Sequence, residues 1–353
     1  MKRSRVLAVA VVAIVALSFF LRRPADVQHG EVQAVAIRSF RATTSILSQP
    51  AFNSDGSLLA ISRVDGIVDV RRVVDGQLLR TLRVPGGVTS VAFNPGGDKL
   101  ATGGYDHTVR LWQVTTGTPL AILGGHTGTI WSVAFSPDGH TLASSGEDAT
   151  VRLWRASDGA PIRVLRGHGR NVWSIAFSPD GQRLASGSFD DTVKIWSVST
   201  GELLRTLTGH REAVVSVAYS PDGELIASGG DDAMIRLWRA RDGALVRTIH
   251  APNHVYTLSF TPDGKWLASG GRECGNLVSF WKQITGNRIR WHYNDTFRLW
   301  KVSDGSLQFA SAAHHDDVRF LAISPRGPWL ATSSEDATTR LWRIGERLQG
   351  VGR

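Results

Sequence analysis

Four sets of residues in this chain combine a histidine, a hydroxyl side chain and an aspartate, the three groups of a hydrolytic triad. Each set also contains a tryptophan, and the members are His126, Ser144, Asp148, Trp154; His168, Ser186, Asp190, Trp196; His210, Ser228, Asp232, Trp238; and His314, Thr332, Asp336, Trp342. A hydrolase needs one activated nucleophile beside an oxyanion site, whereas four copies at one spacing indicate a repeated structural unit. We therefore predict no catalytic residue, no metal site and no cofactor.

The repeat has a period of 42 residues. Trp112, Trp154, Trp196 and Trp238 follow at that interval, and so do Trp300 and Trp342, but Trp238 and Trp300 are 62 residues apart. An aromatic residue before a turn keeps the same period, at Phe52, Phe93, Phe135, Phe177, Tyr219 and Phe260, with Ile323 in the last position. The chain therefore contains seven units, and the sixth carries about 20 extra residues.

Each unit shows the pattern of four short strands. In the fourth unit we predict strands at 172–177, 183–188, 192–198 and 202–207, separated by turns such as Ser178-Pro179-Asp180-Gly181. Proline and glycine stand there at the positions that turn geometry favours. One such sheet cannot cover both of its faces, but sheets stacked radially bury them. The pattern predicts an all-β fold.

These motifs resemble the WD-repeat family over about residues 32–344. The resemblance rests on Gly167-His168, Ser178-Pro179-Asp180-Gly181, Leu184-Ala185-Ser186-Gly187, Asp190 and Ile195-Trp196, which recur in register, although aspartate never follows the tryptophan. It implies a seven-bladed β-propeller of four-stranded antiparallel blades. It also implies that each His, Ser or Thr, Asp and Trp set is a hydrogen-bond chain inside a blade, and that residues 32–40 complete the seventh blade beside 338–344. The first unit has Arg71 in the tryptophan position.

The N-terminal residues 1–30 have the pattern of a membrane segment. Three basic residues within the first five precede residues 6–21, which are uncharged, and Arg22 and Arg23 follow. We predict an N-terminal hydrophobic helix of about 24 Å, slightly shorter than the hydrocarbon core. An uncleaved anchor is favoured because no small-residue cleavage site follows; a cleaved signal peptide and a buried core helix are the alternatives. The charges favour an anchored protein with its propeller on the non-cytoplasmic side. If the segment were cleaved, the protein would be secreted or periplasmic.

The insertion in the sixth unit covers residues 272–293 and imitates a half-blade. Trp281 followed by Thr285-Gly286 repeats the pattern of a third and fourth strand. The spacing from Asp304-Gly305 to His314 favours Trp300 as the residue that completes blade six, so the copy around Trp281 is predicted to project as a hairpin. An exchange of the two copies is the alternative. Cys274 lies in the insertion and is interpreted as an incidental thiol, the single cysteine of the chain.

A candidate partner surface combines aromatic and charged positions that should lie near the central channel on the face of the histidine loops. Its predicted members are Tyr105, Trp131, Glu147, Trp173, Phe189, Asp231, Tyr256, Arg319, Glu335 and the inserted Trp281. Such a set would suit a basic or amphipathic peptide. The alternative is that the aromatic rings simply pack between blades.

These observations predict a non-catalytic scaffold for protein interaction. The propeller is expected over 31–345, with a tail at 346–353, as a monomer bound to a protein or peptide partner. The net charge of +9 includes +4 from the first 30 residues, and the rest alternates in sign, so we expect no nucleic acid partner. A propeller hydrolase or lyase with a site at the channel mouth, and a nucleic-acid-binding propeller, are the alternative functions.

Overall fold

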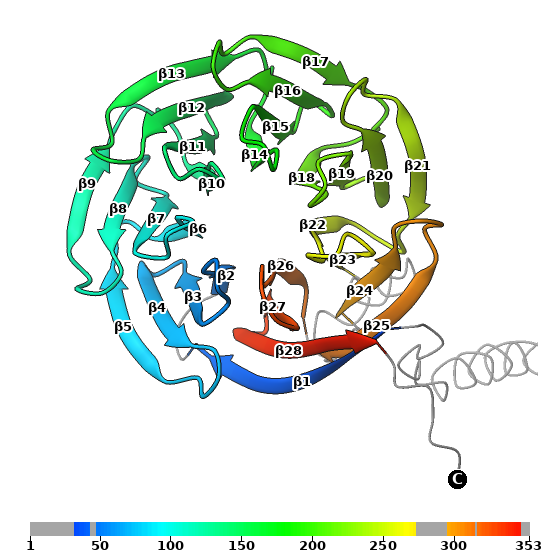
Figure 1. Ribbon diagram of the computed structural model, residues 1–353, viewed down its shortest axis with the longest axis horizontal. Helices are drawn as coiled ribbons and strands as arrows, with labels where there is room; N and C mark the ends of the chain where they lie inside the picture. Colours follow the sequence, from blue (N-terminus) through cyan, green and yellow to red (C-terminus); the bar gives the residue numbers. More distant parts are fainter. Residues whose placement is uncertain (1–31, 43–46, 273–294, 315, 347–353) are drawn as a thin grey trace, which may run out of the picture.

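The computed structural model is a ring of seven four-stranded sheets arranged around a central channel (Figure 1). It describes residues 32–42, 47–272, 295–314 and 316–346. The predicted membrane segment 6–21 and the C-terminal residues 347–353 lie outside these ranges. Within them, no helix is long and apolar enough to cross a membrane.

Each blade runs from the channel to the rim in the order of its strands. Blades one to three contain β2 (Leu47–Phe52), β3 (Leu58–Arg63), β4 (Ile67–Arg72) and β5 (Leu78–Arg83); β6 (Val88–Phe93), β7 (Lys99–Gly104), β8 (Val109–Gln113) and β9 (Pro119–Leu123); and β10 (Ile130–Phe135), β11 (Thr141–Gly146), β12 (Thr150–Arg155) and β13 (Pro161–Arg166).

Blades four and five contain β14 (Val172–Phe177), β15 (Arg183–Ser188), β16 (Val193–Ser197) and β17 (Leu203–Leu207); and β18 (Val214–Tyr219), β19 (Leu225–Gly230), β20 (Met234–Arg239) and β21 (Leu245–His250). Blades six and seven contain β22 (Val255–Phe260), β23 (Trp266–Gly271), β24 (Asp295–Lys301) and β25 (Leu307–His314); and β26 (Val318–Ile323), β27 (Trp329–Ser334), β28 (Thr338–Glu346) and β1 (Val32–Arg41). All neighbouring pairs are antiparallel, as predicted.

The turn between the first two strands of a blade explains its sequence. In blade four the Ser178 hydroxyl donates to the Asp180 carboxylate (2.5 Å), and the backbone N–H of Arg183 donates to the same hydroxyl (2.9 Å). Gly181 has φ +69°, a left-handed conformation that a side chain would strain. Contacts within the turn itself therefore fix the hairpin.

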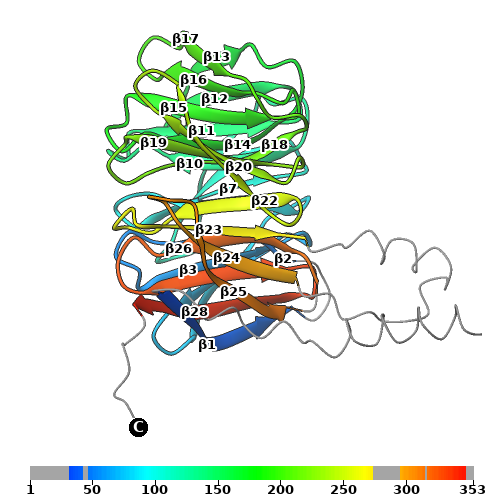
Figure 2. The ribbon, with the colours of Figure 1, turned by 90° about the vertical axis from the view of Figure 1, so that its right-hand side faces the viewer.

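The ring closes through its own ends. β1 pairs with β28 in the register Val32 to Glu346 and Arg41 to Thr338, which is the pairing predicted for the missing fourth strand of blade seven. Figure 2 shows the two strands side by side at one edge of the disc. Val32, Phe309, Trp342 and Ile344 are buried in one apolar cluster there, so the closing strand is also held to blade six. The pairing extends to Glu346, one residue beyond the predicted end of the propeller.

Blade six is completed by the Trp300 copy of the half-blade. Trp300 on β24 lies opposite Leu267 on β23, and β25 follows as the outer strand. The predicted alternative, an exchange with the copy around Trp281, is therefore not what the structure shows. Trp281 and Cys274 lie outside the described residues, so the projecting hairpin predicted there stays a prediction.

Apolar clusters between neighbouring blades form the core. The cluster between blades four and five combines Ile195 and Leu207 with Val214, Ile226 and Trp238, all of which are buried. At about 25 cal/mol per Å² of apolar surface removed from water, these interfaces are the main source of stability. Radial stacking therefore buries the sheet faces, as the sequence pattern predicts.

The rim strands carry arginines that connect one blade to the next. The Arg163 guanidinium on β13 donates to the carbonyl of Ser199 (2.9 Å), in the turn before the rim strand of blade four. Arginines at the equivalent positions repeat this contact, namely Arg38 to Val73, Arg80 to Thr115, Arg205 to Arg241 and Arg247 to Ser303 and Asp304. On β25 the equivalent residue is Phe309, which packs against the closing strands because blade seven has no such turn.

Candidate functional site

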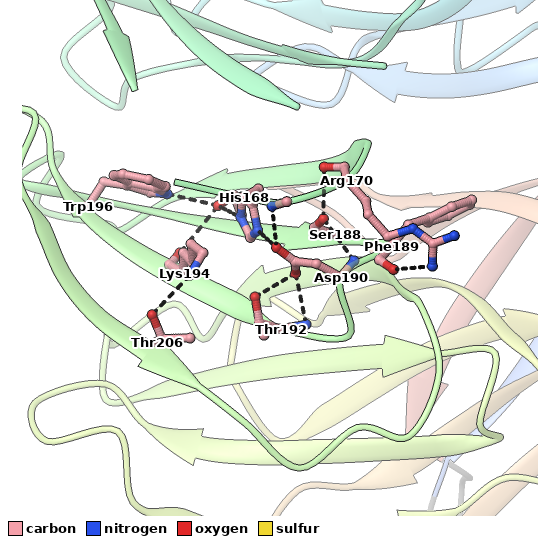
Figure 3. A network of polar contacts seen from close by, with 11 residues as sticks. His168, Arg170, Ser188, Phe189, Asp190, Thr192, Lys194, Trp196 and Thr206 are labelled. Carbon is pink, nitrogen blue, oxygen red and sulfur yellow. Dashed lines mark hydrogen bonds and ion pairs between the residues drawn. The ribbon is translucent and has the colours of Figure 1, made fainter. Parts of the chain in front are cut away.

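The four predicted polar sets form hydrogen-bond chains within their blades. In blade four the Trp196 indole N–H donates to Ser186 Oγ (2.8 Å), Ser186 Oγ lies 2.7 Å from His168 Nε2, and His168 Nδ1 lies 2.8 Å from Asp190 (Figure 3). Blades three, five and seven have the same order of contacts, with distances of 2.7 to 3.1 Å. A histidine proton on Nδ1 would make each chain run from tryptophan to aspartate.

The hydroxyl of each set cannot act as a nucleophile from this position. Ser144, Ser186, Ser228 and Thr332 are 0% exposed or nearly so, and the tryptophan N–H already occupies an acceptor site on each oxygen. A substrate would have to displace a buried blade strand to reach them. The geometric likeness to a hydrolytic triad is therefore a consequence of structural hydrogen bonding.

The aspartates of the sets in blades three, four and five are held in the ionised form. Burial alone would raise the pKa of Asp190, but hydrogen bonds from His168 and Thr192 and the backbone N–H of Gly169 lower that pKa well below its ordinary range. The pKa values of Asp148 and Asp232 are lowered in the same way by His126 and His210. Several donors on one carboxylate outweigh its desolvation.

Blade one replaces the set with a charged pair that sequence analysis missed. Arg71, in the tryptophan position, lies 3.2 Å from Asp69, and its guanidinium lies 5.1 Å from the centre of the Phe40 ring on β1. The position of Asp69 is basic in every other blade, at Arg110, Arg152, Lys194, Arg236, Arg298 and Arg340. Blade one therefore has arginine in place of tryptophan and aspartate in place of the basic residue, and the two form an ion pair. The change of charge two residues before the tryptophan position could have been read from the sequence.

The central channel contains a cavity of about 380 Å³ that is lined by the first strands of all seven blades. Trp131, Trp173 and Tyr256 line it at the start of those strands. Hydroxyls in the strands connect neighbouring blades, since the backbone N–H of Val217 donates to Ser174 (3.1 Å) and that of Leu258 to Ser216 (2.9 Å). The channel wall is thus closed by blade-to-blade hydrogen bonds, and its mouth has a fixed shape.

A repeated backbone hydrogen bond holds the loop residues next to this mouth. In blades three, four, five and seven the N–H of the residue before the turn aspartate donates to a carbonyl just ahead of the first strand, as in Phe189 to Asn171 (3.0 Å) and Glu335 to Asp317 (3.0 Å). Glu147 and Asp231 make the same bond to Thr129 and Ala213. The predicted surface positions are therefore neighbours of the channel-lining residues.

Aromatic rings occupy the mouth on blades two to four, and we call Tyr105, Trp131, Trp173 and Phe189 the aromatic half. Trp131 and Trp173 are stacked at 4.2 Å, Trp173 and Phe189 at 5.2 Å, and the edge of Tyr105 meets Trp131 at 6.1 Å. The rings pack between blades, as the alternative interpretation held, yet all four remain partly exposed. They form a continuous apolar ridge.

Ionisable residues occupy the mouth on blades five to seven, and we call Asp231, His254, Tyr256, Arg319 and Glu335 the charged half. His254 Nδ1 lies 3.2 Å from the Asp231 carboxylate, and Arg319 lies 2.7 Å from that of Glu335. The Arg319 guanidinium also lies 4.3 Å above the Tyr256 ring. The structure therefore brings the predicted residues together in two groups rather than as an interleaved ring.

Beside the charged half lies a buried carboxyl that the sequence did not single out. The side chain of Asp317 is 7% exposed, with Arg272 Nε at 3.8 Å and Arg319 Nη2 at 4.0 Å. Burial raises the pKa of Asp317 to about 6, because neither arginine is close enough to offset the loss of water and Glu335 adds repulsion. The sequence did not mark Asp317 as important, because no other blade has an aspartate at the position before its first strand.

Glu147 and Trp281 are the predicted surface residues that neither group includes. Glu147 is exposed, and its carboxylate accepts from the N–H of Thr129 in its own blade (3.2 Å). Trp281 lies outside the described residues. Over the described part of the chain, no three His, Cys, Asp or Glu side chains are placed to hold a metal ion.

A closed ring of seven four-stranded blades, four of which contain an internal chain of tryptophan, serine or threonine, histidine and aspartate, defines a repeat-type β-propeller. The sequence profile described as "WD domain, G-beta repeat" matches residues 76–113, 117–155, 159–197, 201–239, 243–282 and 305–343. The chain belongs to this WD40 family. The fifth match ends on the Trp281 copy of the half-blade, whereas the fold uses the Trp300 copy.

Curated relatives share part of this propeller sequence. An uncharacterized WD repeat-containing protein of Synechocystis is 35% identical over 94 residues, which are 26% of this chain and 27% of that protein. Protein tipD of Dictyostelium discoideum is 35% identical over 82 residues, 23% of this chain and 13% of its own. SLOW WALKER 1 of Arabidopsis thaliana is 29% identical over 126 residues, 33% of this chain and 24% of its own. In each case the match spans well under two thirds of the relative.

Proposed function

We propose that the chain is a non-catalytic WD-repeat scaffold that binds an amphipathic peptide segment of a partner protein at the channel mouth. The juxtaposition of the aromatic half and the charged half carries this proposal. A peptide whose apolar side chains cover the ridge would place its charged side chains over Asp231, Arg319 and Glu335. WD40 propellers commonly bind protein partners, which agrees with this reading.

The aromatic half is expected to contribute most of the binding free energy. Large aromatic side chains contribute most to binding when their position is already fixed in the free protein, because little side-chain entropy is then lost. Stacking fixes Trp131, Trp173 and Phe189 in this way. The charged half would select the partner, because surface ion pairs add specificity more than affinity.

Photo-crosslinking on the full chain tests the peptide site. A photoreactive amino acid replaces Tyr105 at the mouth, and in a matched control it replaces Leu204 at the rim; the two native side chains are exposed to 43% and 45%. We expect a discrete adduct from position 105 that Arg319→Glu weakens at least about tenfold, corresponding to 1.4 kcal/mol. Equal adducts from both positions, or an adduct insensitive to Arg319→Glu, would contradict the proposal.

We also propose that residues 6–21 hold the scaffold at a membrane, with the propeller on the non-cytoplasmic side. The support is the uncharged run between Arg5 and Arg22 and the excess of positive charge before it. Alkaline extraction of membranes should leave the full chain in the pellet and release a variant lacking residues 6–21. Protease added to intact spheroplasts should digest the propeller; protection there, with digestion after lysis, would reverse the proposed orientation.

A further inference from the structure

The exposed apolar side chains of this protein gather on its rim, which is formed by the outermost strand of each blade. In the described part of the chain, every exposed large apolar side chain except Val74 and Tyr105 lies on one of these rim strands. Examples are Ile37 on β1, Ile122 on β9 and Leu204 on β17. Apolar surface that collects in one region indicates contact with a partner or a membrane.

The rim strands also carry positive charge without any negative charge. None of the seven contains aspartate or glutamate, and their eight arginines are Arg38, Arg41, Arg80, Arg83, Arg163, Arg166, Arg205 and Arg247. Some of the guanidinium groups donate to carbonyls of the next blade, but a neutral carbonyl leaves the positive charge in place. Arginine beside exposed aliphatic side chains is the composition of a surface that binds at the interface of a bilayer with anionic lipid.

One arc of the rim is connected to the proposed membrane segment. β1 is itself a rim strand, and residues 22–31 link it to residues 6–21. Ten residues span at most about 35 Å even when fully extended, so an anchored segment keeps β1 within that distance of the bilayer. The rim strand beside β1 is β5 of blade one, and Arg38 on β1 donates to the Val73 carbonyl just before it (Figure 1). We call these two strands and the turn before β5 the β1–β5 arc.

The β1–β5 arc combines apolar surface and positive charge. Four of the eight rim arginines lie on its two strands. The acidic residue of its turn, Asp75, is paired with Arg72 (2.8 Å), so it does not offset the charge of those arginines. The exposed aliphatic side chains of the arc are Val35 (53%), Ile37 (48%), Val74 (76%) and Leu78 (45%).

We propose that the β1–β5 arc rests on the surface of a bilayer that contains anionic lipid. Its aliphatic side chains enter the boundary between headgroups and acyl chains, and its arginines contact the lipid phosphates. The inference rests on the membrane segment proposed above, because a tether gives the arc a high effective concentration at the bilayer. The disc then stands on its edge, and both of its faces, including the channel mouth, stay open to a partner (Figure 2).

The composition of the arc and its place in the chain select a bilayer over other anionic partners. Nucleic acid would attract the arginines, but its binding is dominated by phosphate contacts and gives exposed aliphatic side chains no apolar phase to enter. An acidic protein could cover the arc only by diffusing to it. The tether instead brings a bilayer within reach of the arc on every molecule.

Fluorescence of the full chain in vesicles tests the contact. Ile37→Cys is introduced into a Cys274→Ser background and labelled with an environment-sensitive dye. Leu204→Cys is the matched control, because Leu204 is the equivalent residue of β17, is similarly exposed and lies across the ring (Figure 1). The vesicles contain phosphatidylcholine, alone or with about 30 mol% phosphatidylglycerol as the anionic lipid.

We expect the emission from position 37 to rise and shift to the blue in the vesicles with phosphatidylglycerol, and the emission from position 204 to stay constant. Salt at about 1 M shortens the Debye length to about 3 Å and should reverse most of the change. A response at position 37 no greater than that at position 204 would overturn the proposal. A response that DNA produces as strongly as these vesicles would also overturn it, because it would indicate a general anion site.

Charge reversal on the arc provides a second matched pair. Arg83→Glu should reduce the response at position 37 at least about twofold, since it removes one attraction to the anionic surface and adds a repulsion. Arg166→Glu, at the equivalent position of β13, should leave the response unchanged. Both arginines are exposed, so both variants are expected to fold, as an unchanged circular dichroism spectrum would show. Equal responses in the two variants would contradict the proposed contact.

Alkaline extraction of the same vesicles reads the tether separately. A chain that resists extraction but gives no response at position 37 would keep the tether and remove the contact of the arc. A chain that is extracted, yet responds at position 37 before extraction, would remove the tether and support the contact. Failure of the proposed anchor and failure of the inference from the rim are therefore distinguishable.

Discussion

One buried hydroxyl lies at the centre of the hydrogen-bond chain in each of the four blades that contain the full polar set. Ser186 accepts a hydrogen bond from the Trp196 indole and bonds to His168, while the aspartate at the end of the chain is ionised. Such a network stabilises the fold only when every member has a partner, because buried polar groups without partners are costly. The repetition of these sets was visible in the sequence, and it is what revealed their structural role.

Ser186→Ala should therefore destabilise the protein by about 1–3 kcal/mol, since it leaves the Trp196 N–H and the His168 ring without their shared partner. The measurement is urea unfolding of the full chain in detergent, followed by tryptophan fluorescence. Ser199→Ala, on an exposed turn of the same blade, is the control and should change the midpoint little. An unfolding midpoint equal to that of the control would show that the chain of bonds carries no stability.

Asp317 should make stability fall as the pH rises. Its pKa is about 6 in the folded protein and near 3.8 when unfolded, so the folded state binds more protons between these values and loses that advantage as the carboxyl ionises. Asp317→Asn should leave stability unchanged near pH 4 and raise it by up to about 3 kcal/mol at pH 8. Urea unfolding at the two pH values checks this; a variant less stable than the wild type at pH 8 would show that the ion pairs with Arg272 and Arg319 dominate.

The strands and their hairpins were predictable because their signals are local. Turns such as Ser178-Pro179-Asp180-Gly181 fix each hairpin within a few residues, and the predicted strands of blade four match β14 to β17 closely. The rim arginines were not predicted, because their partners lie about 35 residues away in the next blade. The contact from Arg247 to Ser303 spans 56 residues, the same interval enlarged by the insertion.

Arg163→Ala should weaken the contact between blades three and four by about 0.5–1.5 kcal/mol, the usual net value of a hydrogen bond. Arg166→Ala is the matched control, since Arg166 lies on the same strand and is also exposed. Hydrogen exchange of the β16 and β17 amides should increase in the first variant and stay constant in the second. Equal exchange in both would mean that apolar packing alone holds the blades in register.

The ring as a whole was predictable from the count of seven periods and from the expectation that residues 32–40 complete the seventh blade, which the pairing of β1 with β28 confirms. The arrangement of the mouth was not, because stacking of Trp131 on Trp173 joins residues 42 positions apart whose relative tilt no pattern encodes. Blade six shows the same limit. Trp281 and Trp300 both satisfy the local pattern, and only the structure shows that Trp300 lies on β24, which pairs with β23 and β25.

Closure by β1 predicts that a covalent bond between the ends of the ring would stabilise the whole molecule. Val35 and Arg343 lie opposite one another on β1 and β28, and both side chains are exposed. In a Cys274→Ser background, Val35→Cys with Arg343→Cys should form a disulfide that closes nearly the whole propeller into one loop. Chain entropy then predicts a gain of about 5 kcal/mol, seen as a higher urea midpoint that a reductant reverses.

The two single variants are the controls for this bond. If the oxidised and reduced double variant unfolded at the same urea concentration, opening at the β1 and β28 pair would not be part of unfolding. The result matters for the proposed tether, because only ten residues, 22–31, separate residues 6–21 from the start of β1. If residues 6–21 anchor the chain as proposed, a force on them would reach the propeller first at this pair, where Arg71 of blade one contacts Phe40. The disulfide should therefore stabilise the propeller against unfolding most when a pulling force acts on the proposed anchor.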